Sequence, residues 1–224
     1  MINEITLLGQ SSSLLEVIAM LTGIAGVWLT MKQNMWCFPI GIINVSLYAW
    51  LFMTPGVRLY ADALLQCIYI LLLFYGWMNW ADKNKKTENI HPVNIKSPIA
   101  IKLFLICLFS TIILAIFLQK FTDAAYPWLD SALTCASLAS QWMIAKKIIE
   151  NWIVWIIVDI IYLPLYIIKH LPLTAILYTI FLVMAFNAAR SIHSVRFVSI
   201  EALIFSGSLM FPAASNSGMT LSSC

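Results

Sequence analysis

The residues best suited to chemistry lie in one apolar stretch of the second half of the chain, which reads ENWIVWIIVDIIYLPLY over residues 150–166. On an α-helix, Trp152, Trp155 and Asp159 stand at positions i, i+3 and i+7, so they project from one face. A carboxylate inside a bilayer costs at least about 2.5 kcal/mol and therefore requires a compensating role. Because indole faces attract cations, the pattern predicts a cation site walled by indole rings.

The composition indicates a membrane protein with several spans. Of the 224 residues, 62% are hydrophobic and 10% are charged, and the mean hydropathy is +0.90. These are too few charges to cover a soluble globule. The net charge of +3 is small and the basic residues are scattered, which argues against a nucleic-acid surface. The five cysteines stand singly, without metal-site spacing. No basic region of a cleavable signal is visible, so we expect the first span to direct insertion.

Seven apolar stretches are long enough to cross about 30 Å of hydrocarbon. The predicted spans are residues 14–31, 36–53, 59–80, 99–119, 128–145, 151–168 and 171–190. The predicted organisation is an N-terminal tail (1–13), a first three-helix unit (14–80), a charged cytoplasmic loop (81–98), a linker helix (99–119), a second three-helix unit (128–190) and a C-terminal tail (195–224).

The two three-helix units repeat each other. A shift of 114 residues places Glu16 on Asp130, Trp28 on Trp142 and Lys32 on Lys146, a shift of 116 places Trp36 on Trp152, and a shift of 112 aligns 61–74 with 173–186. Because one helix separates the units, the repeats run parallel, related by an axis along the membrane normal. The predicted fold is an all-α integral membrane protein with a 3+1+3 helix order. Transporters of this kind place their substrate near the midplane between the repeats, which favours a carrier.

Four sequence segments resemble the PnuC family of vitamin transporters across roughly residues 14–192. They are ENWIVWIIVD (150–159), GIINVSLY (41–48), RLYADALLQ (58–66) and YPWLDS (126–131). The resemblance implies a fold similar to a duplicated SWEET sugar-transporter unit and carriage of a vitamin, best known as nicotinamide riboside. It also implies a bacterial inner membrane location, facilitated diffusion with trapping by a cytoplasmic kinase, a homo-oligomer (a trimer), and no cofactor.

The resemblance also implies roles for individual residues. Trp152 and Trp155 would stack on the aromatic ring of the vitamin, and position 159 would hydrogen-bond it. Nicotinamide riboside carriers often have Asn at that position, and this chain has Asp159. Nicotinamide riboside and thiamine are both flat aromatic cations, so a carboxylate there favours a cation over a neutral nucleoside.

Four further residues are predicted to line the same site: Asn44, Gln66, Trp36 and Tyr178. Asn44 is the first-repeat counterpart of Asp159, although a buried amide can equally bond a neighbouring helix. Gln66 and Tyr178 are repeat mates that could face each other across a pocket. Trp36 aligns with Trp152, with anchoring at the membrane interface as the alternative.

The favoured function is uptake of nicotinamide riboside. Thiamine, another vitamin or nucleoside, and an ion-coupled mechanism remain alternatives. An enzyme is disfavoured because the chain lacks paired acids, a histidine cluster and a nucleophile elbow. A channel or a structural subunit would leave the Trp, Trp, Asp face unexplained, and the sequence shows no Gly-rich filter loop.

The basic residues predict that the N-terminus lies outside and the C-terminus in the cytoplasm. This topology places ten of the thirteen basic residues on the cytoplasmic side. They are Lys32, Lys83, Lys85, Lys86, Lys96, Lys102, Lys146, Lys147, Arg190 and Arg196. We predict that a reporter fused after Arg196 is active only in the cytoplasm, with a fusion before Leu14 as the control of opposite sign. A reporter exposed on the outer face after Arg196 would contradict this topology.

Overall fold

The computed structural model describes residues 4–7, 10–53, 60–82, 94–122, 126–168 and 175–191. The chain divides into two compact units, Met1–Ala189 and Arg190–Cys224. The first unit contains the packed helices. Residues 83–93 of the predicted charged loop and the predicted tail at 195–224 lie outside the described residues.

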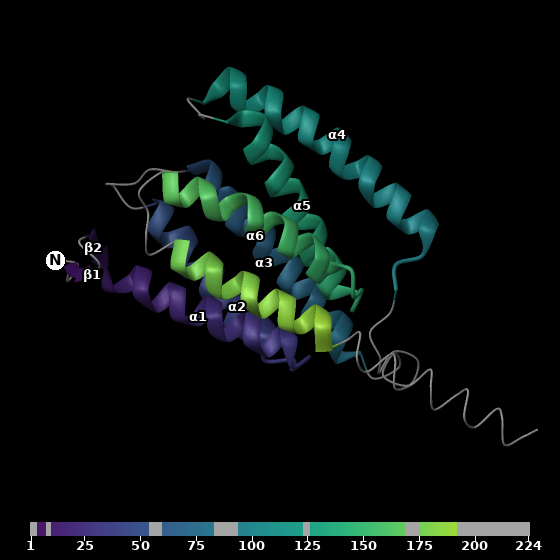
Figure 1. Cartoon of the computed structure of the whole chain (residues 1–224), viewed down its shortest axis with the longest axis horizontal. Helices are drawn as coiled ribbons and strands as arrows, with labels where there is room; N and C mark the ends of the chain where they lie inside the picture. Colours follow the sequence, from purple (N-terminus) through teal and green to yellow (C-terminus); the bar gives the residue numbers. More distant parts are fainter. Residues whose placement is uncertain are drawn as a thin grey trace, which may run out of the picture. The chain divides into compact units, whose positions relative to one another are not determined.

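Seven helices are present among the described residues, in the predicted order (Figure 1). They are α1 (Leu14–Met31), α2 (Cys37–Met53), α3 (Tyr60–Ala81), α4 (Ser97–Phe121), α5 (Pro127–Ala145), α6 (Asn151–Ile168) and an unlabelled seventh helix, drawn in yellow-green, over Ala175–Ser191. Their ends fall within a few residues of the predicted spans. Runs of apolar residues bounded by polar joints therefore suffice to locate each helix.

The N-terminal tail contains a short hairpin that was not predicted from the sequence. Strand β1 (Glu4–Leu7) pairs antiparallel with β2 (Gln10–Ser13). Polar and apolar residues alternate in β1, which is the period of an extended strand. The hairpin precedes α1 directly and adds no span.

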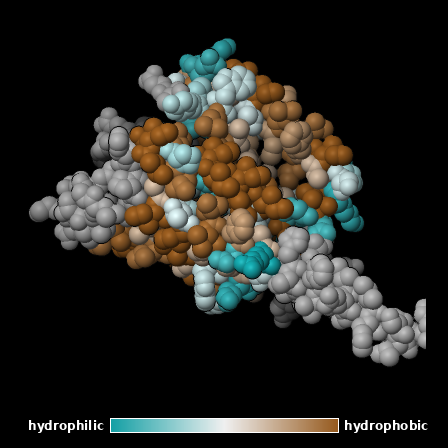
Figure 2. All heavy atoms as spheres, viewed as in Figure 1, coloured by the Kyte–Doolittle hydropathy of each residue, from teal (hydrophilic) through white to brown (hydrophobic). Residues whose placement is uncertain are grey.

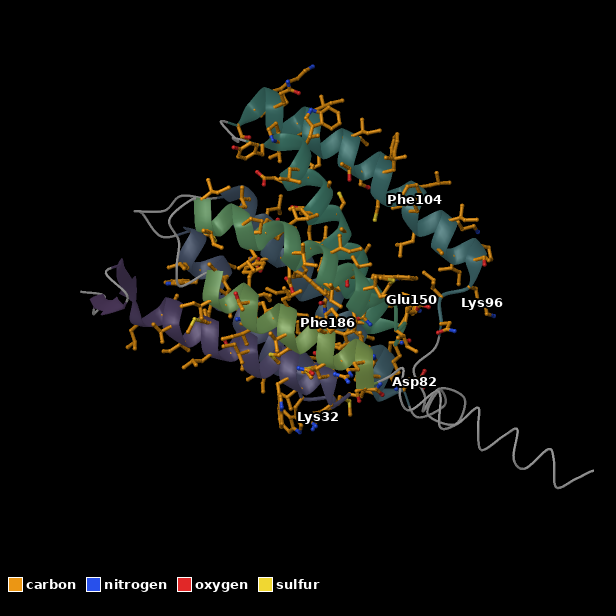
Figure 3. The ribbon with its side chains drawn as sticks, in the orientation of Figure 1. Lys32, Asp82, Lys96, Phe104, Glu150 and Phe186 are labelled. Atoms are coloured by element: carbon orange, nitrogen blue, oxygen red, sulfur yellow. The ribbon has the colours of Figure 1, made fainter. Side chains whose placement is uncertain are left out.

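Helix α4 has the exposed apolar surface expected of a helix in lipid. It packs against α5 (Figure 1), and its phenylalanines Phe104, Phe109 and Phe121 are 66 to 72% exposed. Phe104 points away from the other helices in Figure 3. Exposed apolar area on this scale is rare on soluble monomers. Hydrophobic residues also dominate the face seen in Figure 2, with hydrophilic residues at its margins.

Two of the described helices are long and apolar enough to cross a membrane, α3 over Leu64–Ala81 and α4 over its full length. Four shorter apolar stretches of helix, of 10–17 residues, are Val17–Met31, Cys37–Leu51, Asn151–Leu165 and Ala175–Ser191. Charged residues gather where helices end. Figure 3 shows Lys32, Asp82, Lys96 and Glu150 toward one end of the helices. There the Glu150 carboxylate accepts a hydrogen bond from the backbone N–H of Ile95, at 3.0 Å.

The ends of α1 and α5 show the internal repeat in the backbone itself. Gln33 and Lys147 are the described non-glycine residues with positive φ, at 50° and 57°, and they are 114 positions apart. Each stands just past its helix and closes the same pair of hydrogen bonds. Gln33 N donates to Thr30 O and Asn34 N to Leu29 O, while Lys147 N donates to Ile144 O and Ile148 N to Met143 O. Both are Schellman motifs, so the two units reverse direction in the same way.

The repeat also corrects one sequence alignment. The same 114-residue shift relates Cys37, where α2 begins, to Asn151, where α6 begins. Phe38 is therefore the structural counterpart of Trp152, and the two are 0% and 6% exposed. The alignment of Trp36 with Trp152 by a shift of 116 is wrong. That alignment was chosen to match two tryptophans, whereas the backbone turns give a shift of 114 residues. Trp36 lies just before α2 and is 66% exposed.

The core of the unit joins the two repeats. Its buried cluster comprises Cys37, Phe38, Leu73, Trp80 and Ile144, from α2, α3 and α5. The rings of Phe38 and Trp80 meet edge to face at 5.0 Å. A Cβ on Gly76 would overlap the Phe38 ring and lie 3.2 Å from the Cβ of Ala145. Glycine at position 76 thus allows α3 to approach both α2 and α5.

We predict that Gly76→Ala lowers the free energy of unfolding by about 1 to 3 kcal/mol, because it overpacks a filled core. Thermal unfolding of the detergent-solubilised protein measures this effect. Gly26→Ala is the matched control, because the nearest atoms to a Cβ on Gly26 are 3.9 Å away. Alanine at that helical position should be neutral or stabilising. Equal stability of Gly76→Ala and the unsubstituted protein would contradict this account of the core.

Candidate functional site

Helix α6 turns its predicted functional face inward. Trp152 and Asp159 are 6% and 3% exposed. On the opposite side of the helix, Ile153, Ile157 and Ile160 are each about half exposed. Isoleucines at i, i+4 and i+7 form an apolar stripe suited to lipid. The helix therefore presents one face to the bilayer and the Trp, Trp, Asp face to the protein interior.

The carboxylate of Asp159 is buried without a partner in the part of the chain that the structure describes. No described side chain or backbone N–H donates a hydrogen bond to it, and no described cation pairs with it. Burying an unpaired ion carries an effective penalty of several kcal/mol. A buried acid left in this state is typical of a functional group that awaits a ligand.

Trp155 places this face against the first repeat. Its side chain packs on the buried cluster around Phe38 and Trp80, as do Ile42 and Val45 of α2. Val45 is the neighbour of Asn44, and Asp159 follows Trp155 by one helical turn. Trp155 therefore packs where residues of α2, α3 and α5 meet.

Asn44 is held by α1. Its amide Nδ2 donates to the backbone oxygen of Ala19 at 2.5 Å and to the hydroxyl Oγ1 of Thr22 at 3.2 Å. A Cβ on Gly23 would lie 3.2 Å from Nδ2 of Asn44 and 3.5 Å from the ring of Phe181. The small residue lets α2 and the seventh helix approach α1 closely at this level.

A chain of aromatic rings connects the two sides of the site. Tyr162 of α6 meets Tyr178 of the seventh helix edge to face at 5.5 Å. Tyr178 in turn meets Phe181 at 6.0 Å, and Phe181 lies beside Gly23. Tyr162 lies three residues after Asp159 on α6. Its contact with Tyr178 therefore places Tyr178 in the same region of the molecule as Asp159. Tyr162 and Phe181 were not predicted from the sequence. Extending the α6 face by one turn would have identified Tyr162.

The remaining predicted residues are less closely placed. Gln66 is partly buried on α3. Trp36 is 66% exposed and does not share the enclosed position of Trp152. Among the described residues, no group of three His, Cys, Asp or Glu side chains could hold a metal ion. The candidate groups on the described helices are indoles, phenols, an amide and a carboxylate, which are types that suit binding of a small aromatic molecule.

The helical fold with its internal repeat and the inward face of α6 indicate a membrane transporter for a small molecule. The family model for nicotinamide mononucleotide transporters matches residues 13–191. The chain belongs to this family, the PnuC transporters, which are multi-pass proteins of the bacterial inner membrane.

Individual relatives agree with the family assignment. The nicotinamide riboside transporter PnuC of Escherichia coli (strain K12) is 22% identical over 214 residues, covering 84% of this chain and 89% of the relative. PnuC of Neisseria mucosa is 24% identical, covering 74% and 64% of the two chains. The riboflavin/roseoflavin transporter RibM of Streptomyces davaonensis is 19% identical, covering 67% and 70%.

A solved structure confirms the predicted fold class. The crystal structure of the vitamin B3 transporter PnuC superposes with a TM-score of 0.64 at 22% identity, covering 80% of each chain. The helical transporter fold with two parallel three-helix repeats is therefore the fold of this protein.

We predict that Asp159→Asn raises the stability of the ligand-free protein by about 1 to 3 kcal/mol, because it removes an unpaired buried charge. Asn44→Leu serves as the comparison. It deletes two hydrogen bonds to α1 and should lower stability by roughly 1 to 2 kcal/mol. Thermal unfolding of both variants in the same detergent measures the difference in sign. A loss of stability in Asp159→Asn would show that the acid holds the fold together.

Proposed function

We propose that this protein carries a flat aromatic cation, with nicotinamide riboside as the favoured substrate, into the cell. The observation that carries the proposal is the inward face of α6, where a buried carboxylate without a described partner follows Trp152 and Trp155. Indole faces attract a cation by about 0.5 to 2 kcal/mol, the larger value applying when the pair is desolvated. A carboxylate beside the same ring adds charge attraction that a neutral amide lacks.

The names of the relatives support a vitamin as the cargo. Because they name different vitamins, the choice among them is argued from the residues of the α6 face. The E. coli and Neisseria relatives are nicotinamide riboside transporters, and the Streptomyces relative carries riboflavin. Riboflavin is flat but uncharged, so Asp159 favours the cationic riboside. Thiamine carries the same charge on a flat aromatic ring and is the second candidate.

The proposed mechanism is rocking of the two three-helix units around a midplane site, as a carrier rather than an enzyme. Substrate moves by facilitated diffusion, and a cytoplasmic kinase traps it by phosphorylation. The N-terminus lies outside and the C-terminus in the cytoplasm, which puts the charged end marked by Lys32 and Lys96 on the inner side. We also propose, from the family resemblance, that the protein is a homo-oligomer, a trimer.

Uptake of labelled nicotinamide riboside into proteoliposomes tests the transport activity. We expect equilibration without a proton or sodium gradient, and counterflow when the vesicles are preloaded with unlabelled riboside. Accumulation above the outside concentration should require an enclosed kinase and ATP. Accumulation driven by an ion gradient would contradict facilitated diffusion, and transport of thiamine alone would transfer the proposal to the second candidate.

Two substitutions test the role of the α6 face. We predict that Asp159→Asn weakens binding of the riboside about 10- to 150-fold, because a charge-assisted contact contributes about 1.5 to 3 kcal/mol. Trp155→Phe should weaken binding about 3- to 10-fold, because indole is the strongest cation–π partner. Trp50→Phe, at a position that is 69% exposed, is the control and should leave binding unchanged. Calorimetry on the purified protein measures all three, and unchanged affinity in Asp159→Asn would argue against a charge role.

A further inference from the structure

The two repeats meet along two seams that the internal symmetry makes equivalent. In one seam, α3 of the first repeat packs against α5 of the second. In the other, the seventh helix of the second repeat reaches α1 of the first, where the ring of Phe181 lies beside Gly23. Each seam therefore joins the third helix of one repeat to the first helix of the other.

Burial along the helices agrees with this equivalence. A shift of 112 residues relates α3 to the seventh helix. It takes Leu73 and Gly76, which are buried, to Ala185 and Ala188, which are buried as well. The shift of 114 residues found at the two left-handed turns relates α1 to α5. Side chains at equivalent positions of the two seams can therefore be compared directly.

One pair of equivalent contacts differs in its chemistry. In the α3–α5 seam, the side-chain hydroxyls of Tyr69 and Ser137 form a hydrogen bond. The two shifts take Tyr69 to Phe181 and Ser137 to Gly23, the residues that meet in the other seam. Both seams thus place an aromatic side chain against a small residue at the same position. Phenylalanine and glycine have no hydroxyl, so this contact of α1 with the seventh helix is apolar.

The α3–α5 seam has further polar contacts at the C-terminal end of α5. Asn79 and Trp80 donate hydrogen bonds to two carbonyls of α5, at 2.8 and 3.2 Å. The shift of 112 takes these two residues to Ser191, which keeps a side-chain donor, and to Ile192, which has none. The second repeat therefore lacks the counterpart of the indole donor in its sequence.

We propose that the two seams have diverged into a hydrogen-bonded seam, α3 with α5, and an apolar seam, the seventh helix with α1, and that the apolar seam opens more readily in the conformational cycle. Movement at the hydrogen-bonded seam leaves buried polar groups unpaired, which is costly. A phenylalanine ring can shift along a glycine without such a cost. The hydrogen-bonded seam therefore opens last, and its opening limits the rate of the cycle.

Hydrogen–deuterium exchange of the ligand-free full chain in nanodiscs measures the difference between the seams. The equivalent turns after α1 and α5 provide matched amides, those of Asn34 and Ile148. Exchange rates, corrected for their intrinsic values, report the population of open conformations. We expect exchange after α5 to be at least about tenfold slower than after α1, the equivalent of two hydrogen bonds. Equal exchange of the two turns overturns the proposal.

Two variants remove the central hydrogen bond of the α3–α5 seam. Tyr69→Phe and Ser137→Ala should each raise exchange after α5 about threefold, which corresponds to the roughly 0.6 kcal/mol mean for interhelical hydrogen bonds in a membrane protein. Because both variants break the same bond, the double variant should exceed neither single variant. Exchange after α1 should stay unchanged in all three proteins.

Ser131→Ala is the matched control, because Ser131 is a buried serine of the same helix whose hydroxyl donates to its own helix, at the carbonyl of Pro127. It breaks no contact between the repeats and should leave exchange after α5 unchanged. An equal rise in Ser131→Ala overturns the proposal, and so does unchanged exchange in both Tyr69→Phe and Ser137→Ala.

Counterflow of labelled nicotinamide riboside in proteoliposomes shows whether this opening limits transport. Tyr69→Phe should speed counterflow about threefold and leave the calorimetric affinity for the riboside unchanged. Unchanged or slower counterflow overturns the rate-limiting role of the hydrogen-bonded seam. Absence of counterflow in the wild-type protein, together with unequal exchange of the two turns, overturns the proposed function and leaves the two unequal seams standing.

Discussion

Two repeats can enclose a site only while they stay packed against each other, and the contact of α3 with α5 provides this packing. Gly76 allows α3 to reach the ring of Phe38, which is completely buried and meets Trp80 edge to face. At the same place Asn79 and Trp80 donate hydrogen bonds to carbonyls in the last turn of α5. Carbonyls at a helix end lack partners within the helix. The α5 end is thus completed by side chains of the other repeat.

The residues with left-handed backbone at the ends of α1 and α5 determine that α2 and α6, the helices that follow, are equivalent in the two repeats. A non-glycine residue in this conformation costs about 1 to 2 kcal/mol, so its occurrence at Gln33 and again at Lys147 reflects the reversal that each unit needs. The reversal places α2 and α6 at matching positions. Asn44 and Asp159 then lie at nearly the same depth, one residue apart in register. One residue corresponds to about 100° around a helix, so Asn44 and Asp159 project in different directions from their helices.

Hydropathy sufficed to predict the helices because a bilayer requires long apolar runs, and the bounds of α1 and α6 match the prediction at both ends. The face of α6 followed from the helical period alone. The pairing of Trp36 with Trp152 failed, because apolar residues align at many offsets and only the backbone at Gln33 and Lys147 fixes the register. The ring chain through Tyr178 and the hydrogen bond from Asn44 to Thr22 depend on which helices are neighbours, and sequence spacing within one helix carries no such information.

A carrier must expose its site to each side in turn, so the packed end of the repeats has to separate at some stage. Polar contacts contribute to this end. Asn79 and Trp80 each donate a hydrogen bond to a carbonyl of α5, a contact worth about 0.5 to 1.5 kcal/mol. The Lys147 ammonium lies 4.9 Å from the centre of the Trp80 ring, a contact worth about 0.5 to 1 kcal/mol when exposed. These polar contacts add to the apolar packing of Phe38, Trp80 and Ile144 at the same place. A ligand shifts the balance between two conformations only by its differential affinity for them. A ligand that pairs with Asp159 better in one conformation than in the other supplies such a difference, so the carboxylate of α6 is the group through which cargo can act on the packed end of the repeats.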